Sequence, residues 1–191
     1  MPGLKTLLAD LMSGDEARAE AAVPALVRLG EKVLPALREE ALSKDPEHRW
    51  WAVRVLAELP QTRAGELAFF LRDPAAEVRQ AAALGLAAHP DETILPDLIR
   101  TLHDPDPLTA SLAGNALVKN GPAAVPALLA VLNEERQEVR ILALRALVEL
   151  KDQRSIPAML KLVQEDSAII VHWAQEGLER LGLNMVYIKP T

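Results

Sequence analysis

One helical pattern of apolar residues recurs along the chain at a nearly constant interval. In each copy an alanine is followed four residues later by a leucine, so both side chains fall on the same face of a helix. The alanines are Ala22, Ala52, Ala82, Ala113, Ala143 and Ala174, and the leucines are Leu26, Leu56, Leu86, Leu117, Leu147 and Leu178. Neighbouring copies are 30 or 31 residues apart. This fixed period predicts a stacked helical-repeat protein.

A second apolar ladder precedes the first in every copy and predicts another helix. Its members are Leu7, Leu37, Leu67, Leu98, Leu128 and Met159. Proline stands two residues before four of them, and a first helical turn tolerates proline because its missing N–H has no partner there. Each repeat is therefore predicted as two antiparallel helices. The predicted pairs cover about residues 4–29, 33–59, 64–88, 94–119, 123–150 and 155–181.

Short polar turns such as Asp73-Pro74 separate the two helices of a repeat, and glycines such as Gly30 follow several second helices. The last second helix carries polar residues away from its apolar face, as a terminal repeat requires. No linker interrupts the period. We therefore expect one domain over residues 1–183 and a short extended tail over residues 184–191.

Composition narrows the range of functions. Half of the residues are hydrophobic but only 3% are aromatic, so the core must consist of Ala, Leu and Val, as is typical of all-helical proteins. There is no cysteine, which excludes disulfides and thiolate metal sites. The net charge of −6 disfavours nucleic acid as a partner, because phosphate binding needs a basic surface.

No apolar run approaches the roughly 20 residues that span a bilayer. The first residues lead directly into an amphipathic helix and show no hydrophobic signal region. We therefore expect no membrane contact and a cytoplasmic location.

The segment of residues 73–82, with the sequence DPAAEVRQAA, resembles the signature of HEAT repeats. The resemblance is to the bacterial type called phycobilisome-lyase HEAT-like repeats, and it extends over about residues 4–182. It implies an all-α fold, a right-handed α-solenoid of about six HEAT-like helix pairs. It implies little about function, because one fold serves many activities, and the name of the type implies no lyase activity here.

In this family an acidic turn residue bonds an arginine six places later in the same repeat. Asp73 with Arg79 matches this pairing, and Glu134 with Arg140 matches it with a conservative change. Other repeats lack one member of the pair. The departures are Ser43 at the acidic position and Ala110 and Val171 at the arginine position.

The resemblance also implies that the second helices line a concave surface. Positions one and five residues after the arginine position would face this groove, and their mixed polarity suits a protein or peptide partner. The candidate partner-binding residues are Trp50, Arg54, Gln80, Asn115, Arg145 and His172. Trp50 is the favoured anchor, because tryptophan and arginine dominate interface hot spots. Trp51 and Trp173 share an otherwise apolar position and are predicted to pack between repeats.

Signals for catalysis are weak. The four histidines lie in different repeats and none is followed by glutamate, unlike the pattern of iron-binding helical-repeat hydroxylases. His89 and His103 are predicted to be solvated turn residues. No phosphate-binding loop, nucleophile elbow or zinc-protease helix is present. We therefore expect no catalytic residue, no cofactor, no metal and no enzymatic activity.

The predicted function is that of a non-catalytic scaffold or adaptor that binds a protein or peptide on its concave face. One alternative is a bilin lyase-like accessory subunit. A second is a glycosylase-like HEAT protein that binds nucleic acid, and a third is a natural or designed repeat protein without a selected ligand. The oligomeric state stays open.

Overall fold

The computed structural model describes residues 3–165 and 167–183, and all regular elements in these ranges are helices. This confirms the predicted all-α fold. The chain forms two compact units, Met1–Pro90 and Asp91–Thr191, which we call the N-terminal and the C-terminal unit. The single domain over residues 1–183 stays a prediction, and the predicted tail over residues 184–191 lies outside the described residues.

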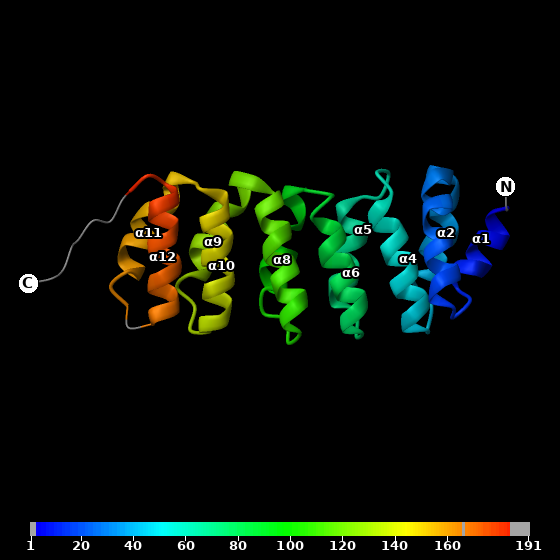
Figure 1. The fold of residues 1–191 in the computed structure, drawn as a ribbon, viewed down its shortest axis with the longest axis horizontal. Helices are drawn as coiled ribbons and strands as arrows, with labels where there is room; N and C mark the ends of the chain where they lie inside the picture. The colour runs from blue at the N-terminus through cyan, green and yellow to red at the C-terminus, as the bar shows by residue number, and fades with distance from the viewer. Residues whose placement is uncertain (1–2, 166, 184–191) are drawn as a thin grey trace, which may run out of the picture. The chain divides into compact units, whose positions relative to one another are not determined.

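Three helix pairs follow one another in the N-terminal unit, in chain order (Figure 1). They are α1 (Leu4–Leu11) with α2 (Glu16–Leu29), α3 (Leu34–Glu40) with α4 (Pro46–Glu58), and α5 (Ala64–Phe69) with α6 (Ala76–Leu86). Short 3-10 helices, η1 (Gly30–Val33) and η2 (Phe70–Arg72), flank the first helices.

The described part of the C-terminal unit has the same plan. Its pairs are α7 (Leu95–Thr101) with α8 (Pro107–Lys119), α9 (Val125–Val131) with α10 (Gln137–Leu150), and α11 (Ile156–Leu162) with α12 (Ala168–Arg180). The 3-10 helices η3 (Glu92–Ile94), η4 (Gly121–Ala124) and η5 (Gln153–Ser155) precede its first helices. The helix pairs agree with the predicted ranges, except that the first helices are shorter because part of each range is 3-10 helix or turn.

Local sequence explains where the helices begin. Pro35, Pro96, Pro126 and Pro157 all lie in the first turn of a first helix, as predicted. Several second helices begin at an aspartate whose carboxylate caps a free backbone N–H. The Asp45 carboxylate accepts from the Glu47 N–H at 2.9 Å, and that of Asp106 accepts from the Thr109 N–H at 2.8 Å.

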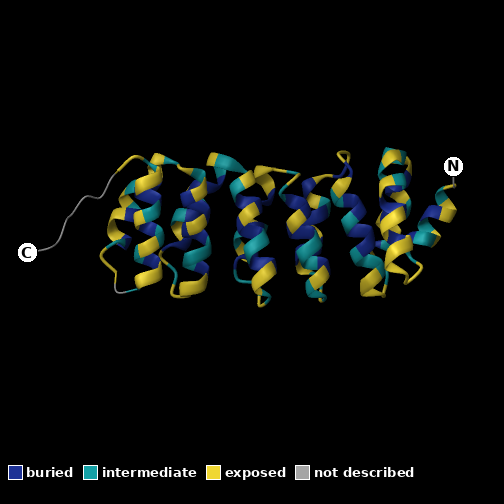
Figure 2. Ribbon diagram, viewed as in Figure 1, coloured by how far each residue is buried: buried dark blue, intermediate teal, exposed yellow. Residues whose placement is uncertain are grey.

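Within each unit, the core lies between the helices of each pair and between neighbouring pairs, where the buried residues are found (Figure 2). All members of both predicted ladders are buried. Two glycines allow close helix packing. A Cβ on Gly85 would lie 2.5 Å from the Ala57 Cβ, and one on Gly177 would lie 2.6 Å from the Met159 sulfur.

In the turns of the N-terminal unit, the structure differs from the pairing of acidic residue and arginine that the resemblance implies. The Asp73 carboxylate does not bond Arg79 of its own repeat. It accepts two hydrogen bonds from Arg49 of the preceding repeat, from Nε at 2.7 Å and from Nη2 at 2.8 Å. Arg79 instead donates to the backbone carbonyls of Asp73 and Pro74.

The C-terminal unit repeats this correction. Arg140 donates to the Leu132 carbonyl at 2.9 Å and, through Nη2, to the Glu165 carboxylate of the following repeat at 2.5 Å. The Glu134 carboxylate bonds His103 rather than Arg140. The arginine therefore binds carbonyls of its own repeat and joins that repeat to the acidic turn of the next one.

Burial by itself would raise the pKa of Asp73. The hydrogen bonds from Arg49 and from the Ala75 N–H, together with the positive charges of Arg49 and Arg79, outweigh it and hold the pKa below its ordinary value. Among the described residues, no helix is long and apolar enough to cross a membrane. The cytoplasmic location stays a prediction.

Candidate functional site

Arginine and tryptophan side chains meet on the second helices of both units. In the N-terminal unit they form a cluster of Glu20 on α2 with Trp50, Trp51 and Arg54 on α4, which we call the N-terminal cluster. The Arg54 guanidinium carbon lies 5.5 Å from the ring centroid of Trp50 and 5.4 Å from that of Trp51. The two indole rings are 4.5 Å apart, edge to face. These distances suit cation–π and aromatic contacts.

In the N-terminal cluster, a carboxylate neutralises the arginine. Arg54 forms a two-point ion pair with Glu20, in which Nη1 bonds one carboxylate oxygen and Nη2 bonds the other at 2.9 Å. Such forked pairs fix both side chains and neutralise the charge of the guanidinium. Arg54 and Trp50 are both half-buried, and Trp51 is only 3% exposed. This cluster therefore has a structural role in joining α2 to α4.

In the C-terminal unit, Arg145 on α10 meets His172 and Trp173 on α12, and we call this group the C-terminal cluster. The Arg145 guanidinium carbon lies 5.3 Å from the Trp173 ring centroid. The rings of His172 and Trp173 are 5.5 Å apart. Arg145 and His172 are exposed, and Trp173 is half-buried. The cluster presents a cation, an imidazole and an aromatic ring on one exposed face.

In the C-terminal cluster, no described carboxylate neutralises the arginine. Within the part of the chain that the structure describes, Arg145 forms no ion pair, whereas Glu149 and Glu176 nearby form ion pairs with Arg180, at 3.6 Å and 2.7 Å. An exposed guanidinium held over an aromatic ring can bind a carboxylate with two parallel hydrogen bonds. This makes the C-terminal cluster the better candidate for a ligand site.

The six predicted residues divide between the two units. Trp50 and Arg54 meet in the N-terminal cluster, and Arg145 and His172 both belong to the C-terminal cluster. Gln80 is half-buried on α6 and Asn115 is exposed on α8, and neither belongs to a cluster. A single groove that joins all six residues stays a prediction.

Sequence reasoning missed the part that Trp173 and Glu20 play. Trp173 is not only a packing residue, because its ring makes a cation–π contact with the guanidinium of Arg145 in the preceding repeat. The signal was present in the sequence as an arginine in one repeat and a tryptophan in the next. Periodicity alone does not show that these two side chains touch.

The turn histidines are not the solvated loop residues that the sequence predicts. His89 is half-buried and its Nε2 lies 2.9 Å from the Ala57 carbonyl oxygen of the preceding repeat. His103 is also half-buried and its Nε2 lies 2.5 Å from the Glu134 carboxylate. Both side chains tie neighbouring repeats together. No group of three metal-ligating side chains occurs among the described residues.

Comparison with known families defines the class of this protein. The model of the HEAT repeats matches residues 66–125 and 112–179, which together exceed half of the chain. The chain therefore belongs to the HEAT repeat family.

Among individual proteins, the chain is similar to the bilin biosynthesis protein RpcF of Synechococcus sp. strain WH8020. The two are 36% identical over 90 residues, which are 47% of this chain and 43% of RpcF. The match thus spans less than half of the length of RpcF.

Two solved structures share the fold. The complex of CpcE and CpcF of phycocyanin lyase from Nostoc sp. PCC7120 matches with a TM-score of 0.57 and 21% identity, over 95% of this chain and 78% of that one. The archaeal HEAT-like repeats protein from Thermococcus onnurineus NA1 matches with a TM-score of 0.64 and 15% identity, over 95% and 81%.

These relatives correct one prediction. RpcF is a bilin biosynthesis protein, and CpcE and CpcF belong to a phycocyanin lyase, which is an enzyme. The prediction that the chain has no enzymatic function is therefore wrong. Of the readings that the sequence left open, the bilin lyase-like one agrees better with the relatives than the scaffold does.

Proposed function

We propose that this chain is a bilin lyase-like HEAT-repeat subunit, which binds an open-chain tetrapyrrole and presents it to a protein partner. The observation that carries the proposal is the 36% identity to RpcF over 90 residues. The shared fold with the CpcE and CpcF complex supports it. That structure contains two different chains, which also favours a protein partner for this one.

The C-terminal cluster offers the chemistry that a bilin needs. A bilin has a flat conjugated body and two propionate carboxylates. In this proposal Arg145 binds one propionate through its guanidinium, and the indole of Trp173 lies against the conjugated rings. His172 supplies a hydrogen bond to the polar edge of the pigment.

The role of this chain would be to bind and orient the pigment. Neither cluster contains a thiol or a hydroxyl nucleophile, and the 191 residues include no cysteine. The acceptor group for the pigment therefore belongs, in this proposal, to the partner protein. Orientation of two reactants is by itself a large source of rate enhancement.

Biliverdin, an open-chain tetrapyrrole with two free propionates, is the probe for this proposal. We expect the visible absorbance of biliverdin to shift and saturate when the purified protein is added. Arg145→Gln should raise the Kd about five-fold, because it removes one exposed charge-assisted contact. Biliverdin dimethyl ester has the same body without the carboxylates, and its Kd should not respond to this substitution.

Arg28→Gln is the matched control, because Arg28 is an exposed arginine on α2 outside both clusters. It should leave the Kd for biliverdin unchanged. Failure of the wild-type protein to shift the absorbance of biliverdin would refute the proposed function. A normal Kd for Arg145→Gln would refute the assignment of the site.

A further inference from the structure

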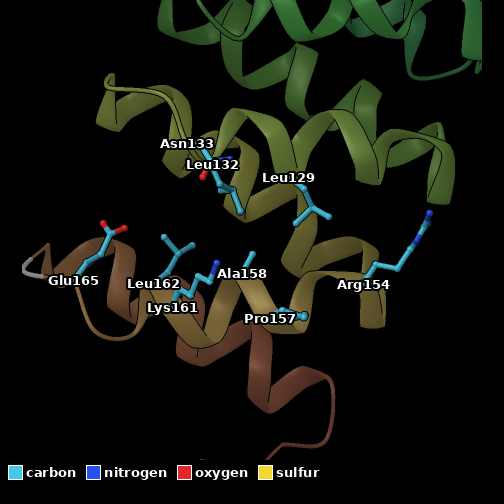
Figure 3. Close-up of a pocket in the computed structure, with 9 residues that line it drawn as sticks. All are labelled: Leu129, Leu132, Asn133, Arg154, Pro157, Ala158, Lys161, Leu162 and Glu165. Atoms are coloured by element: carbon cyan, nitrogen blue, oxygen red, sulfur yellow. The ribbon is translucent and has the colours of Figure 1, made fainter.

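A cleft opens between α9 and α11, the first helices of two neighbouring repeats in the C-terminal unit (Figure 3). Its volume is about 380 Å³, within the range of small-molecule sites. Apolar side chains from both helices line it. They are Leu129 and Leu132 on α9 and its C-terminal end, and Pro157, Ala158 and Leu162 on α11.

Polar side chains also line this cleft, and most of their charge is already neutralised. Arg154 forms two hydrogen bonds with Asp152, at 2.9 Å and 2.7 Å, and donates to the Pro122 carbonyl at 2.8 Å. The hydrogen bonds that Asp152 accepts from the side chain and the backbone N–H of Arg154 lower its pKa to about 2. The carboxylate of Glu165 is bonded to Arg140.

Lys161 is the exception. It lines the cleft from α11, its side chain is exposed, and it forms no ion pair with any residue that the structure describes. The cleft therefore combines several apolar side chains with one positive charge that no described carboxylate neutralises. A ligand that matches both features has an apolar body and a single anionic group.

We propose that the cleft between α9 and α11 binds a small amphipathic anion, with an aromatic or aliphatic body against the leucines and its anionic group at Lys161. This site is distinct from the C-terminal cluster, which lies on α10 and α12. Its ligand also differs from a bilin, because the cleft offers one unneutralised cation, whereas a bilin carries two propionates.

Two dyes test the proposal, because they share an aromatic body and differ in charge. They are 1-anilinonaphthalene-8-sulfonate, which is an anion, and N-phenyl-1-naphthylamine, which is neutral. We expect saturable fluorescence enhancement of the anionic dye with one equivalent per chain. Lys161→Gln should raise its Kd about three-fold and leave the Kd of the neutral dye unchanged.

Ala158→Trp tests the apolar part of the site, because the indole would fill the cleft. Both dyes should lose binding in this variant. Lys119→Gln on α8 and Ala9→Trp on α1 are the matched controls, since both residues are exposed and lie outside the cleft. Unchanged helical circular dichroism and an unchanged melting temperature would show that each variant is folded.

Binding that Ala158→Trp leaves intact would overturn the proposal, and so would equal effects of Lys161→Gln on the two dyes. Arg145→Gln should not affect either dye. This makes failure of the cleft and failure of the proposed bilin site separate results.

Discussion

The two units treat equivalent arginines differently. Arg49 and Arg54 in the N-terminal unit each form a two-point ion pair with a carboxylate. Arg140 and Arg145 occupy the same positions of a repeat in the C-terminal unit. Arg140 reaches the more exposed Glu165 through one nitrogen, and Arg145 has no carboxylate partner among the described residues.

The repeat that precedes each arginine accounts for part of the difference between the clusters. Glu20 and Ser111 stand at the same position, one residue after the arginine position, in the repeats that precede Arg54 and Arg145. In the N-terminal unit this position supplies the carboxylate that neutralises Arg54, and the tryptophans lie in the same repeat as Arg54. In the C-terminal unit it supplies a hydroxyl, and the aromatic rings come from the repeat that follows Arg145.

The largest expected effect concerns the buried pair of the N-terminal unit. The side chains of Arg49 and Asp73 are only 12% and 7% exposed, so Asp73→Asn would leave a nearly buried guanidinium without its counter-charge. We expect a loss of about 3 kcal/mol in the free energy of unfolding. Glu165→Gln, at the equivalent and more exposed pair, should cost only about 0.5 kcal/mol.

Urea unfolding of the full chain measures both variants, and hydrogen exchange assigns each loss to its unit. Equal losses for the two variants would contradict the contrast between a nearly buried ion pair in the N-terminal unit and a more exposed one in the C-terminal unit.

Lowering the pH should remove the contribution of the Asp73 carboxylate to the stability of the fold. Its pKa in the folded protein is lowered, so its contribution to stability is complete above the unfolded pKa of about 4 and is lost as the pH falls through the lower folded value. The difference in unfolding free energy between wild type and Asp73→Asn should therefore be constant near neutral pH and shrink below about pH 4. If this difference in unfolding free energy grew on acidification, the pKa of Asp73 in the folded protein would not be lowered.

The smallest effect exchanges the ligand properties of the two clusters. His172→Glu places a carboxylate near Arg145, as Glu20 does near Arg54, and should raise the Kd for biliverdin about five-fold. Glu20→Gln frees Arg54 and should allow the protein to bind a second equivalent of biliverdin. Absorbance titration measures both variants. If His172→Glu binds biliverdin as well as wild type, the charge at this position does not decide which cluster is open.

Much of the fold could be read from the chain, because the information is local. The ladder from Ala22 to Leu178 requires only that residues four apart share a helix face, and the prolines mark helix starts through their own backbone geometry. These rules do not depend on what the helix packs against. They correctly place the helix pairs and their buried faces.

The polar contacts could not be predicted in the same way. Asp73 is six residues from Arg79 and 24 residues from Arg49, and it bonds the more distant guanidinium. The local spacing favours Arg79, but the stacking of repeats brings Arg49 to the carboxylate and turns Arg79 toward backbone carbonyls. The contact between Arg145 and Trp173 likewise joins two repeats.

That this protein is built from repeated helix pairs follows from the chain alone, because hydrophobic periodicity acts within each helix. Which arginines are neutralised follows from the packing of the repeats, since an ion pair depends on the distance between side chains of different repeats. That distance depends on how the helices pack, which the spacing along the chain does not specify. The packing of the repeats therefore decides that Arg54 is neutralised and Arg145 is not, and with this it decides where the candidate ligand site lies.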